Sequence, residues 1–301
     1  MATGDAQRYT DAMAGRSFGY GLFHPPRFAD MRPGMVGYID DNGRWHRIAD
    51  LTNSDELRKK GFSDFILPVA DKPDRVKLGP VLSENVHSHE IALEADAAAA
   101  AVALGLPVDI GGVIEYATED NFGAILMCDD EVVFEGFDVR DVFVQWLKDK
   151  KNQSAILKNH RDVKRYGVCV VRGTSSAEQV YLRTWSGAGD RVRVGFKLGF
   201  TGVAALNPEV AYYRANHGAG WRRFDGEKRV VFFTGVKFSY NFLGRGREDR
   251  SGAAFRGDGG DTFTFEDPDE AGMVYDVTIE EFGPPVAEGE DDDFEGDGED
   301  D

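Results

Sequence analysis

The stretch from Asp190 to Phe200, DRVRVGFKLGF, alternates between apolar side chains and charged side chains or glycine. Successive side chains of a β-strand point to opposite faces, so this pattern predicts a strand with one apolar face and one polar, solvent-facing face. The apolar face holds Val192, Val194, Phe196, Leu198 and Phe200. The polar face holds Arg191, Arg193 and Lys197.

A second stretch in which apolar and polar side chains alternate begins at Pro107. One face of the predicted strand includes Val108, Ile110 and Ile114, and the other includes Asp109 and Glu115. Together with NFGAILMCDDEVVF, which follows a turn near residues 119–120, it predicts a long antiparallel hairpin over residues 107–134. Residues 178–200 predict a second hairpin with SGAGD as its turn. Strands of about 9–11 residues suffice to cross a bilayer in a β-barrel. Two interpretations stay open: half-buried strands of a soluble sheet, or strands that convert into membrane-spanning ones.

The rest of the chain mixes helices with antiparallel strands. Helices are predicted over residues 5–16, 54–60, 83–105, 138–152 and 154–165, and further strands over residues 166–174, 177–185 and 229–240. The dipeptide Asn42–Gly43 predicts the turn of a hairpin over residues 35–48. We expect a loop at 68–82, a linker at 241–261, a last small hairpin at 261–282 and disorder beyond it. The expected fold class is α+β, a mainly antiparallel twisted sheet flanked by helices, with two hairpins able to convert.

Charge divides the chain into blocks. Residues 140–250 hold 22 basic and 10 acidic side chains, whereas residues 251–301 hold one basic and 19 acidic side chains. The formal net charge of −18 therefore resides in the C-terminal block, because the first 250 residues sum to zero. A basic middle beside an acidic end indicates an electrostatic partner for the middle, although an acidic end that only solubilises the protein has the same composition.

Seven basic residues fall close together in the predicted helices between residues 148 and 165: Lys148, Lys150, Lys151, Lys158, Arg161, Lys164 and Arg165. Such a cluster suits anionic lipid headgroups, at roughly 1 kcal/mol per basic residue near a charged leaflet. A solvated helix face is the alternative. Nucleic acid is not expected as a partner, because this stretch does not match a known nucleic-acid-binding module in which aromatic residues alternate with basic ones.

Motifs for catalysis or metal binding are weak. HSHE at His87–Glu90 offers candidate ligands without a second cluster to complete a site. NHRD at Asn159–Asp162 resembles part of a kinase catalytic loop but has Gly167 where that loop requires asparagine. We therefore assign no catalytic residue, no metal site and no cofactor. Cys128 and Cys169 are expected as reduced thiols of a cytosolic protein, because no signal peptide or long apolar helix is present.

Three further stretches carry a family resemblance: YGLFHPPRFADMRPGMVGYIDDNGRWHRI (residues 20–48), YGVCVVRGTSSAEQVYLRTW (166–185) and RVVFFTGVKFSY (229–240). Together they resemble the fungal gasdermin-like proteins, which act in heterokaryon incompatibility and regulated cell death. The likeness spans most of residues 17–242. It implies a latent protein that binds acidic phospholipids through basic surfaces, oligomerises, and converts internal segments into two membrane-spanning hairpins. It also implies release by cleavage of a short C-terminal extension or by a different allelic form.

On this resemblance, residues 1–242 are expected to form the pore-forming domain, and residues 243–301 a linker and an acidic, inhibitory extension. A protease is expected to reach the chain near Phe238, Tyr240 and Phe242. The lipid-facing residues of the pore are expected to be Val108, Ile110, Ile114, Val192, Val194, Phe196, Leu198 and Phe200. The residues expected to face the lumen of the pore are Asp109, Glu115, Arg191, Arg193 and Lys197.

The expected partners are acidic phospholipids, further copies of the chain in a membrane oligomer, and either an activating protease or a second allelic variant. The latent protein is expected in the cytoplasm and the active form at the plasma membrane. The alternative is a soluble β-rich interaction protein whose acidic tail binds a basic partner.

Overall fold

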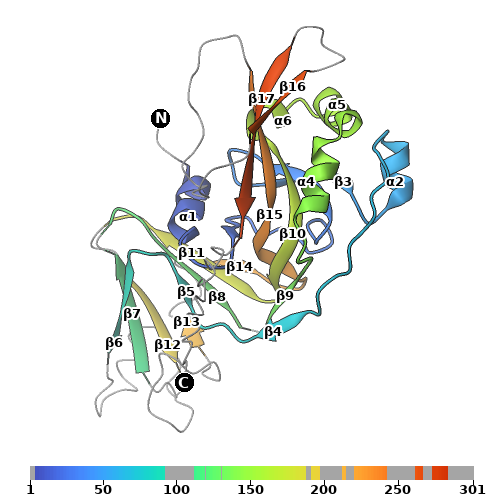
Figure 1. The fold of residues 1–301 in the computed structure, drawn as a ribbon. Coiled ribbons are helices and arrows are strands. Elements are labelled where there is room, and N and C mark those ends of the chain that lie inside the picture. Colours follow the sequence, from blue (N-terminus) through green and yellow to red (C-terminus); the bar gives the residue numbers. More distant parts are fainter. Residues whose placement is uncertain are drawn as a thin grey trace, which may run out of the picture.

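The computed structural model of the chain describes residues 4–91, 112–118, 120–129, 131–187, 191–196, 212–214, 220–242, 262–266 and 273–283. These residues form three antiparallel sheets with a few helices, which confirms the predicted α+β class. The largest sheet lies against the helices, and the two smaller sheets lie to one side of it (Figure 1). Among the described residues, no helix is both long and apolar enough to cross a membrane.

The largest sheet has nine strands, and its central path runs β16–β17–β15–β10–β2–β3. In chain order, the strands of this path are β2 (Met35–Ile39), β3 (Trp45–Asp50), β10 (Val168–Ala177), β15 (Arg229–Phe242), β16 (Thr262–Glu266) and β17 (Val274–Phe282). Off the path, β1 (Tyr20–Gly21) pairs with β15, and β9 (Val132–Gly136) joins β10 to β4 (Asp74–Val76). The two predicted hairpins at 35–48 and 261–282 are confirmed.

Helices also lie against this sheet, although the helix predicted over residues 154–165 is divided into two. They are α1 (Asp5–Met13), α2 (Ser54–Lys59), α4 (Asp141–Lys148), α5 (Lys150–Asn159) and α6 (Val163–Tyr166). The side chain of Asn53 accepts a hydrogen bond from the Glu56 amide and caps α2. The predicted helix over 138–152 is interrupted at Asp149. Its carboxylate accepts from the amides of Lys151 and Asn152 and so begins a new helix, α5.

The largest sheet separates two apolar clusters. On one face, Phe143, Leu147 and Ile156 of α4 and α5 belong to the same buried cluster as Val170 and Phe238 of the sheet. On the other face, the second cluster includes Cys169, Val171, Phe233 and Phe282. Neighbouring residues of β10 thus point to opposite faces, as the alternating pattern of a strand requires.

The two smaller sheets have four strands each. The first, in the order β14–β11–β8–β5, contains β5 (Val81–Leu82), β8 (Gly123–Cys128), β11 (Val180–Trp185) and β14 (Arg222–Phe224). The second, in the order β13–β12–β7–β6, contains β6 (Val86–Ile91), β7 (Gly112–Thr118), β12 (Arg191–Phe196) and β13 (Tyr212–Arg214). In Figure 1 the second sheet lies farthest from α4, α5 and α6.

The predicted pairing within residues 107–134 and within residues 178–200 is wrong. The described part of β7 pairs with β12 and β6, and β8 pairs with β11 and β5, so neither predicted hairpin forms. After β7 the chain passes from the second small sheet to the first, and after β11 it passes from the first to the second. Neither strand is therefore followed by a strand that pairs with it. The strands were predicted correctly, but their neighbours were not.

The predicted helix over 83–105 is also wrong where the structure describes it. Residues 86–91, VHSHEI, form strand β6 and pair with β7 in register from Val86 opposite Thr118 to Ile91 opposite Val113. Pairing with a neighbouring strand outweighs the weak local preference of this segment. The predicted loop at 68–82 holds the two short strands β4 and β5. The linker predicted at 241–261 lies, from residue 243 on, outside the described residues, as does the predicted disordered end.

Candidate functional site

The basic residues predicted to bind headgroups lie on three consecutive helices, α4, α5 and α6, and on the turn before α6 (Figure 1). Lys148 and Lys164 are half-buried, and the other five are exposed: Lys150, Lys151, Lys158, Arg161 and Arg165. Lys151 and Arg165 are among those that contact other parts of the chain. Lys151 donates to the carbonyl oxygen of Phe62 at 3.2 Å, and Arg165 forms an ion pair with Asp41.

The C-terminal hairpin, which we define as β16 and β17, covers both half-buried lysines. The Nζ atom of Lys148 lies 5.6 Å from the ring centroid of Phe263 on β16, and that of Lys164 lies 5.4 Å from the ring centroid of Tyr275 on β17. A cation over an aromatic face is stabilised by the negative potential of the ring. The hairpin thus uses part of the basic surface for contacts within the chain.

Two carboxylates of β17 bind further basic residues. Glu281 accepts from Arg172 at 3.0 Å and lies 3.1 Å from the Nε atom of Arg140. Glu280 lies 3.8 Å from Nζ of Lys237. Burial raises the pKa of Glu280 above its ordinary value, although the nearby lysine acts in the opposite direction.

The C-terminal hairpin is also part of the core. Eight residues of β15, from Gly235 to Phe242, pair with β17. Phe265, Tyr275, Val277 and Ile279 are buried in the cluster beneath α4 and α5, and Phe282 is buried on the opposite face of the sheet. The expected extension therefore supplies two strands to the largest sheet, and the boundary placed at residue 242 stays a prediction.

The predicted cleavage region requires correction. Phe238 is 0% exposed and Tyr240 is 7% exposed, and both pair with β17. A protease needs an accessible, extended segment, so these two residues are closed to it in this fold. Phe242 is 40% exposed at the end of β15, where the chain leaves the sheet.

The described lipid-facing candidates share one apolar cluster. Ile114, Val192 and Val194 are buried together with Tyr116 and Trp185 in a cluster made by the two small sheets. Phe196 lies at the end of β12, but its side chain is not among those described. Val108, Ile110, Leu198 and Phe200 lie outside the described residues, as do the lumen candidates Asp109 and Lys197. At rest, the side chains of Ile114, Val192 and Val194 are covered by other strands of the two small sheets.

The remaining lumen candidates form an ion triad on the opposite face of the same strands. Glu115 of β7 accepts from Nε of Arg193 on β12 at 2.8 Å and also pairs with Arg191. The side chain of Glu115 is only 7% exposed, whereas those of Arg191 and Arg193 are 61% and 41% exposed. Sequence alternation placed these three residues on one face correctly, but their mutual contact depends on the unexpected pairing of β7 with β12.

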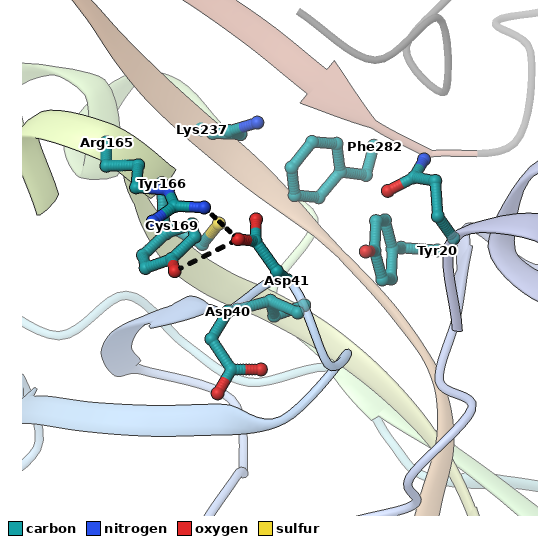
Figure 2. Close-up of a pocket in the computed structure, with 10 residues that line it drawn as sticks. Tyr20, Asp40, Asp41, Arg165, Tyr166, Cys169, Lys237 and Phe282 are labelled. Atoms are coloured by element: carbon teal, nitrogen blue, oxygen red, sulfur yellow. Dashed lines mark hydrogen bonds and ion pairs between the residues drawn. The ribbon is translucent and has the colours of Figure 1, made fainter. Parts of the chain in front are cut away.

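A pocket of about 140 Å³ lies on the other side of the largest sheet from α4, lined by Tyr20, Asp41, Tyr166, Cys169 and Phe282 among others (Figure 2). Burial raises the pKa of the Cys169 thiol to about 12 and that of Tyr20 to about 12. Neither group is ionised at neutral pH, so neither is prepared to act as a nucleophile. The carboxylate of Asp41 is occupied by Arg165 and by the hydroxyl of Tyr166.

Metal ligation finds no support among the residues that the structure describes. They contain no group of three histidine, cysteine or carboxylate side chains arranged to hold an ion. The histidines of the HSHE motif lie on strand β6, not on a helix.

The aromatic rings of the C-terminal hairpin are the functional candidates that sequence reasoning missed. The alternation in VYDVTIEEF predicts a strand, but it carries no signal that this strand docks on β15 and reaches α6. The basic helices and the second small sheet lie at opposite ends of the view in Figure 1, so the structure does not join them in one site.

Comparisons with known proteins give a likeness at the level of structure. No protein family model and no curated protein matches the chain. Among solved structures, the chain is similar to a bacterial gasdermin from Bradyrhizobium tropiciagri, with 12% sequence identity, 76% of this chain and 86% of that chain covered, and a TM-score of 0.27. A TM-score of this size leaves the function to be inferred from the chain's own contacts.

Proposed function

We propose that this chain is a latent pore-forming protein that binds acidic phospholipids, oligomerises and permeabilises the plasma membrane, which kills the cell. It acts without catalysis. We take the latent form to reside in the cytoplasm and the process to be of the heterokaryon incompatibility type, on the family resemblance of residues 17–242.

The observation that carries this proposal is the composition of the apolar cluster between the two small sheets. Its nine buried members are Val86, Ile114, Tyr116, Ile125, Met127, Tyr181, Trp185, Val192 and Val194. All of them come from the strands of these two sheets, and none comes from the largest sheet. The cluster can therefore open without a loss of the core that joins the helices to β10 and β15.

Opening into water would be costly, because each square ångström of exposed apolar surface costs about 25 cal/mol. Opening into a bilayer avoids this cost, since hydrocarbon replaces the apolar neighbours that the side chains lose. The same residues thus favour a closed form in water and an inserted form in lipid.

The contacts of the C-terminal hairpin support an inhibitory role for it. The hairpin places rings over Lys148 and Lys164, and its two carboxylates bind Arg140, Arg172 and Lys237. Its departure would uncover Lys148 and Lys164 on the surface that we propose for headgroups, and would break the ion pairs of Arg140, Arg172 and Lys237 with the hairpin. A cut between residues 242 and 262 leaves the hairpin held by its pairing with β15, so we propose that activation requires cleavage followed by displacement, or displacement alone by a second allelic variant.

Dye release from liposomes tests the function. A specific protease site is placed within residues 243–261 of the full-length chain, and the protein is added to vesicles of phosphatidylcholine with or without phosphatidylserine. We expect release only after cleavage and only with the acidic lipid. The rival, a soluble interaction protein whose acidic tail binds a basic partner, predicts no release in any arm, even when the cleaved protein stays folded.

A further inference from the structure

The pairing of β8 with β11 and the pairing of β7 with β12 share one register. Gly123 lies opposite Trp185 in the first small sheet. Six positions back from Gly123 and six positions forward from Trp185 lead to Ala117 and Arg191, which lie opposite each other in the second small sheet. The two pairs therefore share one register, and β7 with β8 on one side and β12 with β11 on the other make one antiparallel ribbon. We call this the inner ribbon.

The inner ribbon is folded back on itself. In its second-sheet half, the even-numbered residues Ile114, Tyr116, Val192 and Val194 face the shared apolar cluster. In its first-sheet half, the odd-numbered residues Ile125, Met127, Tyr181 and Trp185 face that cluster. Side chains alternate along a strand, so opposite faces of a straight ribbon would hold these two sets. A bend alone would turn the same face of both halves inward, so the alternation must also break between β7 and β8 and between β11 and β12, where residues 120–122 and 186–187 are not strand.

The two outer strands do not keep one register across this bend. On one side of the ribbon, Leu82 of β5 lies opposite Ile125 of β8, and Val86 of β6 lies opposite Thr118 of β7. Between these two pairs the outer chain advances by four residues, whereas the inner chain covers seven. On the other side, Arg222 of β14 lies opposite Leu182 of β11, and Arg214 of β13 lies opposite Val194 of β12. Between these two pairs the outer chain covers eight residues, whereas the inner chain covers twelve. The outer strands are therefore offset by three and by four residues.

We infer that the inner ribbon opens at its bend as one prealigned unit, with its own register kept, while the outer strands slip along it by three and four residues. This inference rests on the proposed pore-forming function. Opening restores the alternation along both strands, so that Ile114, Tyr116, Val192 and Val194 lie on the same face as Ala124, Leu126, Val180 and Leu182. Seventeen residues at about 3.3 Å each give a ribbon of about 55 Å, longer than the hydrocarbon core requires.

The ion triad is placed to preserve this register. Glu115, Arg191 and Arg193 all belong to the inner ribbon, on the face away from the apolar cluster. The triad links β7 to β12 and does not link the second small sheet to the first. A register slip of one residue would turn the carboxylate away from both guanidinium groups, because it moves the side chain to the other face.

Disulfide locks test the inference in the full-length chain with the cleavable linker. In a background with Cys128→Ser and Cys169→Ala, the inner lock joins Ala124→Cys to Thr184→Cys, which are register partners. The outer lock joins Leu82→Cys to Ile125→Cys and Val86→Cys to Thr118→Cys, which fixes one outer strand on both sides of the bend. Vesicles of phosphatidylcholine with phosphatidylserine report dye release before and after reduction.

We expect the inner-locked protein to release dye as fully as its reduced form, and the outer-locked protein to release none until it is reduced. Loss of release with the inner lock, or full release with the outer locks, would overturn the inference and leave the proposed function intact. Absence of release from the reduced, folded proteins would instead contradict the proposed function. Hydrogen exchange of the unmodified cleaved protein on vesicles gives a second reading: continuous protection of β7 and β12 supports a kept register, and its transient loss contradicts it.

Discussion

The ammonium group of Lys164 on α6 lies 5.4 Å from the centre of the Tyr275 ring on β17. The two residues belong to different blocks of charge, one in the basic middle of the sequence and one in its acidic end. Their contact joins the surface that we propose for headgroups to the hairpin that we propose as its inhibitor. The predictions below follow from this arrangement and from the bent ribbon.

Weakening the C-terminal hairpin should increase permeabilisation without any cleavage. Val277 is 0% exposed beside Tyr240, its partner on β15. Val277→Ala should lower the stability of the hairpin by about 1–3 kcal/mol, because it leaves a cavity in the core. The full-length variant should then release more dye from anionic vesicles than the unmodified protein. Thr278→Ala on the same strand, at a half-buried position, is the matched control. Equal release from both variants and the unmodified protein would contradict an inhibitory hairpin.

Hairpin stability should fall as the pH rises through the folded pKa of Glu280. That pKa is raised above the ordinary 4.5 because burial disfavours the carboxylate. A raised pKa means that the folded state holds the proton more tightly, so this contribution to stability is complete below pH 4.5 and is lost above the folded value. Glu280→Gln should remove it. Melting temperatures of the unmodified protein and of Glu280→Gln are measured from below pH 4.5 to above the folded pKa. The same dependence of melting temperature on pH in both proteins would refute the expectation.

Neutralising exposed residues of the basic helices should weaken binding to acidic lipid. Lys150 and Arg161 are both exposed. At roughly 1 kcal/mol per basic residue, Lys150→Gln with Arg161→Gln should raise the dissociation constant for anionic vesicles about 30-fold. Lys77→Gln, an exposed lysine between β4 and β5, is the control. The comparison is made by co-sedimentation of the cleaved protein, and a change of about fivefold with Lys77→Gln, half the free-energy effect of the double variant, would show that only net charge matters.

Gly123 should be required at the bend of the inner ribbon. A Cβ atom there would lie 2.4 Å from the ring of Trp185, its register partner. Gly123→Ala should therefore lower the free energy of unfolding by about 1–3 kcal/mol. Gly283→Ala, where the nearest atom is at an ordinary 3.7 Å, is the control. The melting temperatures report the difference, and restoration of stability in Gly123→Ala by Trp185→Leu would identify the ring as the cause.

The sequence was sufficient for elements whose signals are local. The turn dipeptide Asn42–Gly43 and the short helix predicted over residues 54–60 place β2, β3 and α2 correctly, because each signal lies within the element that it sets. Alternation likewise predicted the faces of β12, with Val192 and Val194 buried and Arg191 exposed.

Pairing between distant strands could not be predicted in the same way. Alternation tells which residues share a face, but it does not identify the neighbouring strand, so β7 and β8 were assigned to one hairpin although β7 pairs with β12. Strand β6 was taken as a helix for the same reason, since its partner lies outside the local window. The contacts of Lys148 and Lys164 join residues more than a hundred positions apart and leave no trace in the local pattern.

The most direct test of the account follows the surroundings of Val194 during permeabilisation. An environment-sensitive fluorophore is attached at Val194→Cys in the background without native cysteines, and fluorescence is recorded with a quencher carried on lipid chains and with a quencher dissolved in water. Thermal melts first establish that the labelled protein is folded. We predict that, as dye release begins on anionic vesicles, the lipid quencher reaches the probe and the aqueous quencher does not. A probe that remains closed to lipid while the vesicles leak would contradict the claim that the apolar face of the ribbon exchanges protein for hydrocarbon.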